Sequence, residues 1–116
     1  MTKITFFRKN GNFWGFREEG HTGFGEEGDD ILCSALSAMT MLILNTLEAS
    51  YGCSVDYVID DETADITIKC LSALPEHSDD ENKQFACEGL FRGYFLQIND
   101  LCDEYYEFLD VDVLDE

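Results

Sequence analysis

The sequence predicts an α+β fold: a small single domain over residues 1–116, with a mainly antiparallel sheet and two helices in the order ββαββαβ. Two pairs of short runs in which apolar residues alternate predict two hairpins. A segment with apolar residues at helical spacing follows each pair, which predicts two helices that cover the sheet. Apolar residues form 45% of the chain, a share typical of a globular core.

The first hairpin is predicted over residues 2–8 and 12–17. Both runs are rich in Ile, Thr, Phe and Trp, and Asn10-Gly11 between them is the signal of a tight turn. The next segment, residues 18–29, contains four glycines and shows no apolar periodicity. It is therefore predicted to be a mobile loop.

The first helix is predicted over residues 31–51. Asp29 or Asp30 supplies the N-cap, and Gly52 supplies the stop after the last turn. If Asp30 is the cap, Cys33 falls at the third helical position. The apolar positions of this helix are Leu32, Leu36, Met39, Ile43 and Leu47.

The second half of the chain predicts another hairpin, a second helix and a final strand. The hairpin strands are residues 54–60 and 64–71, on either side of an acidic turn. A serine-to-glutamate capping box at Ser78 opens a helix that runs to about Asn99, and a short strand follows at residues 106–113. The side chains expected to point inward are Val55, Tyr57, Ile59, Ile66, Ile68 and Cys70 in the hairpin and Phe91, Tyr94, Phe95 and Ile98 in the helix.

The formal net charge is −18, from 25 acidic residues against 7 Lys and Arg. This charge argues against direct binding of nucleic acid, because such binding depends on cationic contacts with phosphates. An acidic surface attracts cationic ligands, so a basic protein is the favoured kind of partner. Taken alone, however, the charge is explained more simply by solubility.

The five cysteines are odd in number and include no Cys-x-x-Cys pair, which argues against a disulfide framework and a structural zinc site. We therefore expect a cytoplasmic protein that needs no metal and no cofactor. The N-terminus lacks the pattern of a signal peptide, and the longest apolar run, around residues 39–44, is too short to cross a membrane. The four cysteines expected to be small buried residues are Cys53, Cys70, Cys87 and Cys102.

The fifth cysteine, Cys33, forms a candidate catalytic pair with His21. The positive end of a helix lowers the pKa of a nearby thiol, and an imidazole holds the thiolate as an ion pair and protonates a leaving amine. Backbone N–H groups at the helix start or in the glycine loop would bind the oxyanion. The loop that holds Phe24 would close over a bound peptide. These are the parts of a cysteine hydrolase.

Each of these residues also has a simpler interpretation. A cysteine in a helix is most often a small buried residue, and a histidine after a glycine is usually a solvated loop residue. Asp30 is explained as a helix cap, and Ser37, one turn after Cys33, as a small residue that shapes a pocket. On helix position alone, the structural interpretation of Cys33 is the stronger one.

Two motifs stand close together in the chain, and they favour the catalytic interpretation of Cys33 over the structural one. They read Gly20-His21-Thr22-Gly23-Phe24 and Asp30-Ile31-Leu32-Cys33-Ser34-Ala35, with Ser37 after them. Together they resemble the signature of the ribosomal-processing cysteine proteases, the Prp family, in which Gly-His-x-Gly-aromatic is followed by Gly-x-Asp-Ile-Val-Cys-Ala and a serine. The order of hairpins and helices agrees with that family as well, so the resemblance covers nearly the whole chain.

The resemblance implies a small bacterial cytoplasmic homodimer that removes a short N-terminal extension from large-subunit ribosomal protein number twenty-seven. It matches His21 and Cys33 to the catalytic dyad of the family. Thr22 and Ser34 stand where family members often have alanine, and neither change touches the dyad. The positions that the resemblance assigns to substrate binding or support of the site are Gly20, Gly23, Phe24, Asp30, Ser34 and Ser37.

Two other functions remain open from the sequence. A non-catalytic acidic dimer that binds a basic ribosomal protein as an assembly factor fits the fold and the charge, but it gives Cys33 no task. A thiol acyltransferase or esterase would use the same dyad on a smaller substrate. Fast alkylation of Cys33 at neutral pH would favour catalysis over binding alone.

Overall fold

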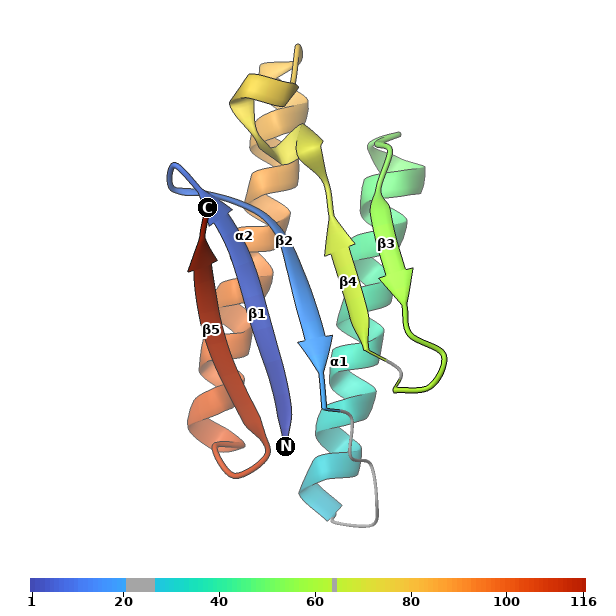
Figure 1. Ribbon diagram of the computed structural model, residues 1–116, viewed down its shortest axis with the longest axis vertical. Helices are drawn as coiled ribbons and strands as arrows, with labels where there is room; N and C mark the ends of the chain where they lie inside the picture. Colours follow the sequence, from blue (N-terminus) through green and yellow to red (C-terminus); the bar gives the residue numbers. More distant parts are fainter. Residues whose placement is uncertain (21–26, 64) are drawn as a thin grey trace.

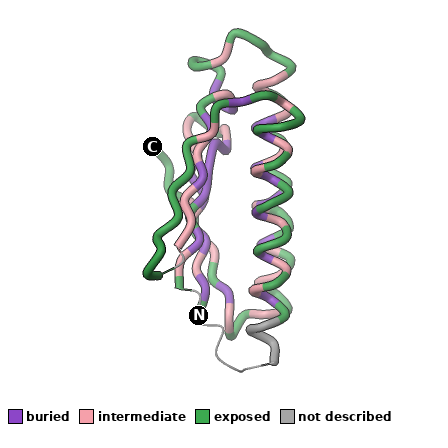
Figure 2. Tube along the Cα trace, turned by 90° about the vertical axis from the view of Figure 1, so that its right-hand side faces the viewer, coloured by how far each residue is buried: buried purple, intermediate pink, exposed green. Residues whose placement is uncertain are grey.

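The computed structural model describes the backbone of residues 1–20, 27–63 and 65–116, and their side chains except those of residues 27–30. A five-stranded sheet in the order β3-β4-β2-β1-β5 forms one layer, and two helices on one face form the other (Figures 1 and 2). β5 runs parallel to β1, and the other neighbouring strands are antiparallel. The predicted α+β class and the order ββαββαβ are confirmed. The elements are β1 (Thr2–Lys9), β2 (Asn12–Glu19), α1 (Glu27–Asn45), the π-helical turn η1 (Thr46–Ser50), β3 (Asp56–Ile59), β4 (Ile66–Lys69), the short turns η2 (Leu71–Ala73) and η3 (Pro75–His77), α2 (Glu81–Glu104) and β5 (Leu109–Asp115).

The predicted antiparallel hairpin of β1 and β2 is confirmed, and both of its strands lie in the interior of the sheet. Asn10 and Gly11 have φ angles of 51° and 83°, the pair of left-handed conformations that a type I′ turn requires. Phe6 on β1 pairs with Phe16 on β2, and both side chains are fully buried with ring centroids 6.0 Å apart. This aromatic centre is the surface on which the helices pack.

The predicted start of the first helix was wrong. α1 begins at Glu27, so Asp29 and Asp30 lie inside its first turn rather than at its N-cap. Acidic residues are favourable there because the unpaired N–H groups make this end of a helix positive. The helical stretch ends as predicted before Gly52, whose φ is 67°. The predicted apolar positions are confirmed, with Leu32, Leu36, Ile43 and Leu47 buried and Met39 half-buried.

The helical stretch Ile31–Ser50 is long and apolar enough to cross a membrane by length and composition, with a mean hydropathy of 1.5. The sequence expectation counted only the uninterrupted run around residues 39–44 and so missed this property. Leu32, Leu36 and Leu47 are fully buried in the core of the fold. Core helices of globular proteins pass the same test, so it is weak evidence for a membrane segment.

The second hairpin is shorter than predicted, and its first strand is not buried. Tyr57 and Ile59 of β3, expected to point inward, are 47% and 51% exposed. β3 is one of the two edge strands of the sheet and all four of its residues are exposed, so on this side the core ends at β4. Ile68 and Cys70 are buried as predicted, while Val55 and Ile66 are half-buried.

Asp80, and not Ser78, caps α2. The Oδ1 atom of Asp80 accepts hydrogen bonds from two backbone N–H groups of the first turn, at 3.0 and 3.1 Å. The hydroxyl of Ser78 donates instead to the backbone carbonyl of Asp80, so the predicted capping box was wrong. The helix runs on to Glu104, and β5 accordingly starts later than predicted, at Leu109. The predicted apolar side of the helix is confirmed, with Phe91, Tyr94 and Ile98 buried and Phe95 half-buried.

Candidate active site

Cys33 lies in the second turn of α1, half-buried between the fully buried Leu32 and the exposed Ser34. Ser37, one turn further on, is exposed as well. Cys33 is not at the predicted third helical position, because the helix begins at Glu27, and the field of a helix end acts mainly within the first turn. Its Cα–Cβ bond nevertheless tilts back toward the helix start, where four backbone N–H groups lack intrahelical acceptors. The cysteine is therefore half-buried and lies close to the helix end at which unpaired N–H groups can bind an anion.

The chain leaves β2 at Gly20, a position that only glycine can occupy without strain. Its φ is 80°, and a side chain there would collide with the carbonyl oxygen of Met1. The N–H of Gly20 donates a 3.2 Å hydrogen bond to the carboxylate of Asp65, which fixes the strand end. Most of the predicted mobile loop lies outside the described residues, and its two ends belong to β2 and α1. The predicted site residues outside the described part of the chain are His21, Gly23 and Phe24, together with the side chain of Asp30.

A buried carboxylate links both helices to the sheet. Glu18 on β2 is 1% exposed and accepts a 2.7 Å hydrogen bond from the hydroxyl of Thr40 on α1. The hydroxyl of Tyr94 on α2 donates a second hydrogen bond to the same oxygen. Burial and the charge of Glu18 raise the pKa of Tyr94, so the phenol keeps the proton that it donates. Thr40 lies two turns after Cys33, so Glu18 anchors the helix that carries the candidate nucleophile.

Glu18 was predicted to lie in the loop, so this network was not predicted. The period of the strand was the available signal. Glu18 stands two residues after Phe16, so the two side chains lie on the same face of β2, and that face is the buried one.

In the described part of the chain, most Lys and Arg side chains already lie close to a carboxylate group. Within the described residues, five of the seven Lys and Arg side chains lie within 4.0 Å of a carboxylate oxygen. The large excess of acidic residues therefore has few cationic partners within the chain. The paired cations are Lys3, Arg8, Lys9, Arg17 and Arg92.

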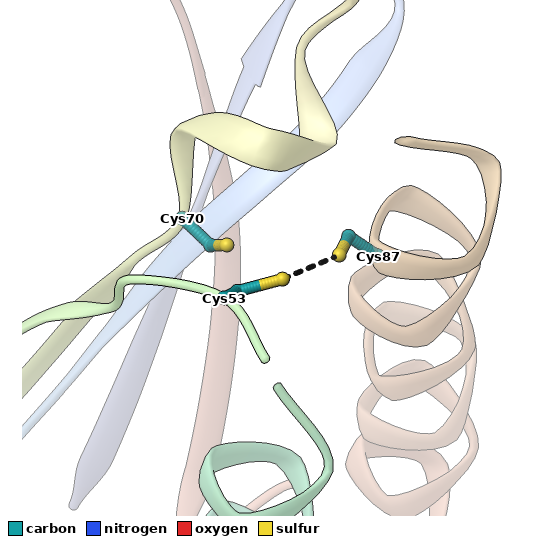
Figure 3. Close-up of side chains that lie close together, drawn as sticks. All are labelled: Cys53, Cys70 and Cys87. Atoms are coloured by element: carbon teal, nitrogen blue, oxygen red, sulfur yellow. Dashed lines mark hydrogen bonds between the residues drawn. The ribbon is translucent and has the colours of Figure 1, made fainter. Parts of the chain in front are cut away.

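Three of the other cysteines meet in space. Cys53, Cys70 and Cys87 are buried, as predicted, whereas Cys102, which was also predicted to be buried, is half-buried near the end of α2. The sulfurs of the first three all lie within 4.8 Å of one another (Figure 3). Their spacing in the sequence gave no signal of this convergence. Among the described residues, they form the group whose ligand atoms lie close enough to hold a metal ion.

The chain thus combines a two-layer α+β fold with a half-buried cysteine near the start of its first helix, and the sequence comparison shows that it is a cysteine peptidase. A sequence model of the family "Cysteine protease Prp" matches residues 1–110, and the chain belongs to this family. No curated protein sequence matches the chain significantly.

Solved structures share the fold over the whole chain. SMU.848 from Streptococcus mutans is 28% identical, with a TM-score of 0.80 over 100% of this chain and 99% of its own. The essential ribosomal processing protease Prp from S. aureus with a substrate peptide is 16% identical, with a TM-score of 0.79 over 98% and 100%. The S. aureus enzyme with a covalently linked product peptide is 19% identical, with a TM-score of 0.76 over 98% and 100%. These two S. aureus structures establish the shared fold.

Proposed function

We propose that the chain is the endopeptidase that removes the short N-terminal extension of bacterial large-subunit ribosomal protein number twenty-seven, with Cys33 and His21 as its catalytic dyad. The observation that carries the proposal is the family match over residues 1–110, which includes both residues. The similar S. aureus structure is that of a ribosomal processing protease with a substrate peptide, which supports a ribosomal protein as the substrate.

The reaction follows from the chemistry of the two side chains. The thiolate of Cys33 attacks the scissile carbonyl carbon, the C–N bond breaks, and His21 protonates the departing amine. Water, deprotonated by His21, then hydrolyses the thioester and restores the thiol. The N–H groups of residues 27–30 are the proposed oxyanion donors. The residues proposed to bind the peptide or support the dyad are Gly20, Gly23, Phe24, Asp30, Ser34 and Ser37.

The charge of the chain supports a basic substrate. A net charge of −18 attracts a Lys- and Arg-rich ribosomal protein, because Coulomb steering concentrates cationic ligands at an acidic surface. The same charge disfavours direct contact with nucleic acid. We expect KM for a basic peptide to rise with ionic strength, since salt screens this attraction.

We also propose that the protein acts as a cytoplasmic homodimer. The outer face of the helix layer exposes Met41 and Leu42 on α1 and Phe85 and Leu96 on α2, each more than half exposed. A hollow of about 250 Å³ lies between the two helices, lined by Leu42, Gly89 and Gly93 among others. A second copy that covers this face would remove exposed apolar side chains of both helices from water.

Sedimentation tests the dimer. Leu42→Lys is expected to shift the protein toward the monomer, because it buries a charge in the proposed interface. Tyr57→Lys on the exposed strand β3 is the matched control and is expected to leave the dimer intact. A monomeric wild-type protein at micromolar concentration would contradict this part of the proposal.

Peptide cleavage tests the activity. The full-length protein is incubated with a peptide that spans the extension of the ribosomal protein of its own host, and the products are identified by mass spectrometry. Cleavage at one bond is expected, and Cys33→Ala is expected to abolish it without loss of folding. Cys102→Ala, a change at a half-buried cysteine on α2, is the matched control and should retain cleavage. An intact peptide after prolonged incubation, or equal cleavage by Cys33→Ala, would refute the proposal.

The alternatives are less well supported. A non-catalytic assembly factor would share the acidic surface, but membership of a peptidase family favours catalysis. An acyltransferase or esterase would leave the peptide intact and cleave a small thioester or ester instead.

A further inference from the structure

Three buried thiols from distant parts of the chain converge on one point. Cys53 follows the end of η1, Cys70 follows β4, and Cys87 lies on α2 (Figure 3). Their exposed fractions are 8%, 0% and 0%. The sulfurs of Cys53 and Cys87 are 3.5 Å apart, and all three sulfurs lie within 4.8 Å of one another. The arrangement is thus a compact triangle of sulfur atoms within the core.

The size of this triangle fits a metal ion bound to thiolates. A metal–sulfur bond of about 2.3 Å places neighbouring sulfurs about 3.8 to 4.0 Å apart. The sulfur separations in the cluster bracket this value, so small rotations of the side chains would suffice to bind an ion. The fold therefore already brings the three sulfurs to separations close to those of a metal site.

The number and chemical type of the ligands determine which metal ion the cluster prefers. Structural zinc and iron–sulfur sites usually take four strong ligands, and the cluster offers three sulfurs. The other groups near Cys70 include the carbonyl of Ser54, 4.0 Å from its sulfur, and Ser72, and their oxygens are hard, weak ligands for these metals. Soft thiolates in a dry site with few ligands suit Cu(I), which accepts low coordination numbers.

A hollow at the surface lies next to the cluster in the sequence. A surface hollow of about 650 Å³ is lined by Ser54, Lys69 and Leu71, the chain neighbours of Cys53 and Cys70. Solvent therefore reaches the chain directly beside Cys53 and Cys70.

We propose that Cys53, Cys70 and Cys87 form a buried binding site for a single Cu(I) ion. Binding replaces the S–H protons, which pass to solvent, and copper stays in the Cu(I) state throughout. The ion would join the end of the α1–η1 helical stretch, the end of β4 and α2. The site is distinct from the candidate active site, because about 25 Å of helix separates Cys33 from the end of η1.

The test titrates the full-length, reduced wild-type protein with Cu(I), supplied anaerobically as its acetonitrile complex, against the chelator bicinchoninate. One tightly bound ion per chain is expected, with three sulfur neighbours by X-ray absorption and a rise in Tm on binding. Cys53→Ser, Cys70→Ser and Cys87→Ser are each expected to weaken Cu(I) binding by about 100-fold or more. Cys102→Ser is the matched control, and Cys33→Ser tests for binding at the candidate active site. Both should bind as the wild type does.

Several outcomes would overturn the proposal. These are the absence of a tight ion, an equal loss in Cys33→Ser, tighter binding of Zn²⁺ than of Cu(I), or a Cys53–Cys87 disulfide that forms in place of copper binding. If the serine variants of the cluster fail to fold, the sulfur count and the stoichiometry of the Cys33→Ser protein decide the question, because that variant retains all three ligands.

Discussion

The hydroxyl of Thr40 on α1 donates a 2.7 Å hydrogen bond to the buried carboxylate of Glu18 on β2. This contact joins the helix that carries Cys33 to the strand that leads to His21 in the sequence. A buried carboxylate depends on such donors, because it has given up its hydration. The bond therefore helps to hold the helix that carries Cys33 against the sheet.

Thr40→Val tests the importance of this hydrogen bond. The change keeps the shape of the side chain but leaves Glu18 with one donor fewer, so the free energy of unfolding is expected to fall by about 1–3 kcal/mol. Urea denaturation measures the effect. Thr46→Val on the same helical stretch is the control, since the Thr46 hydroxyl bonds an exposed carbonyl, and it should cost less than about 0.5 kcal/mol. Equal losses in the two variants would contradict the account.

The raised pKa of Tyr94 predicts a pH dependence of stability. An ordinary tyrosine ionises near pH 10, whereas burial and Glu18 keep the Tyr94 phenol protonated in the folded state. Above about pH 10 the unfolded state alone releases this proton, so stability falls as pH rises. The stabilisation that comes from the protonated Tyr94 is fully present below about pH 10. In the Tyr94→Phe variant, the loss of unfolding free energy with rising pH is expected to be smaller by about 1.4 kcal/mol per pH unit between pH 10 and 11.5.

Denaturation curves across that pH range test the expectation. Tyr106→Phe is the matched control because Tyr106 is 70% exposed, and it should leave the slope of the wild type unchanged. The same slope in the Tyr94→Phe protein as in the wild type would show that Tyr94 ionises normally in the folded state.

Gly20→Ala is expected to destabilise the protein by more than about 1 kcal/mol. The positive φ and the collision with the carbonyl of Met1 both penalise a side chain at this strand end. Gly89→Ala is the matched control, and its effect on stability is expected to be the opposite. Gly89 lies within α2 with no atom within 4 Å of an added Cβ, so alanine should stabilise by about 0.5–1 kcal/mol. Thermal unfolding of both variants measures the difference. A Gly20→Ala variant as stable as the wild type would contradict the backbone conformation described at Gly20.

Asp80→Ala is expected to lower the free energy of unfolding by about 1 kcal/mol, because two N–H groups at the start of α2 lose their acceptor. Ser78→Ala should cost less, since its hydroxyl bonds only the backbone of Asp80. A larger loss for Ser78→Ala would support the capping box expected from the sequence instead.

Much of the fold could be predicted from local patterns. The Asn10-Gly11 turn and the helical spacing of Leu32, Leu36 and Leu47 depend on neighbouring residues alone, and the structure has both. The exposure of Tyr57 could not be predicted, because it depends on which strand lies at the edge of the sheet, and alternation alone does not reveal strand order.

The site was predicted less completely, and for a physical reason. Its motif residues are close in sequence, so their pattern was visible, whereas the start of α1 at Glu27 was hidden by adjacent acids that suit both a cap and a first turn. The partners of Glu18, and the meeting of Cys53 with Cys87, are contacts between distant elements. Only the packing of both helices on the sheet creates them.

The pH dependence of Cys33 alkylation tests the proposed dyad most directly. Iodoacetamide labelling of the native protein is followed residue by residue, with Cys102 as the internal control, since burial and nearby Asp110 raise the pKa of that thiol. Cys33 is expected to react much faster than Cys102 at pH 6 to 7, and His21→Ala is expected to remove this advantage. If Cys33 reacts no faster than Cys102, or if His21→Ala leaves its rate at pH 6 to 7 unchanged, Cys33 is not an imidazole-paired thiolate.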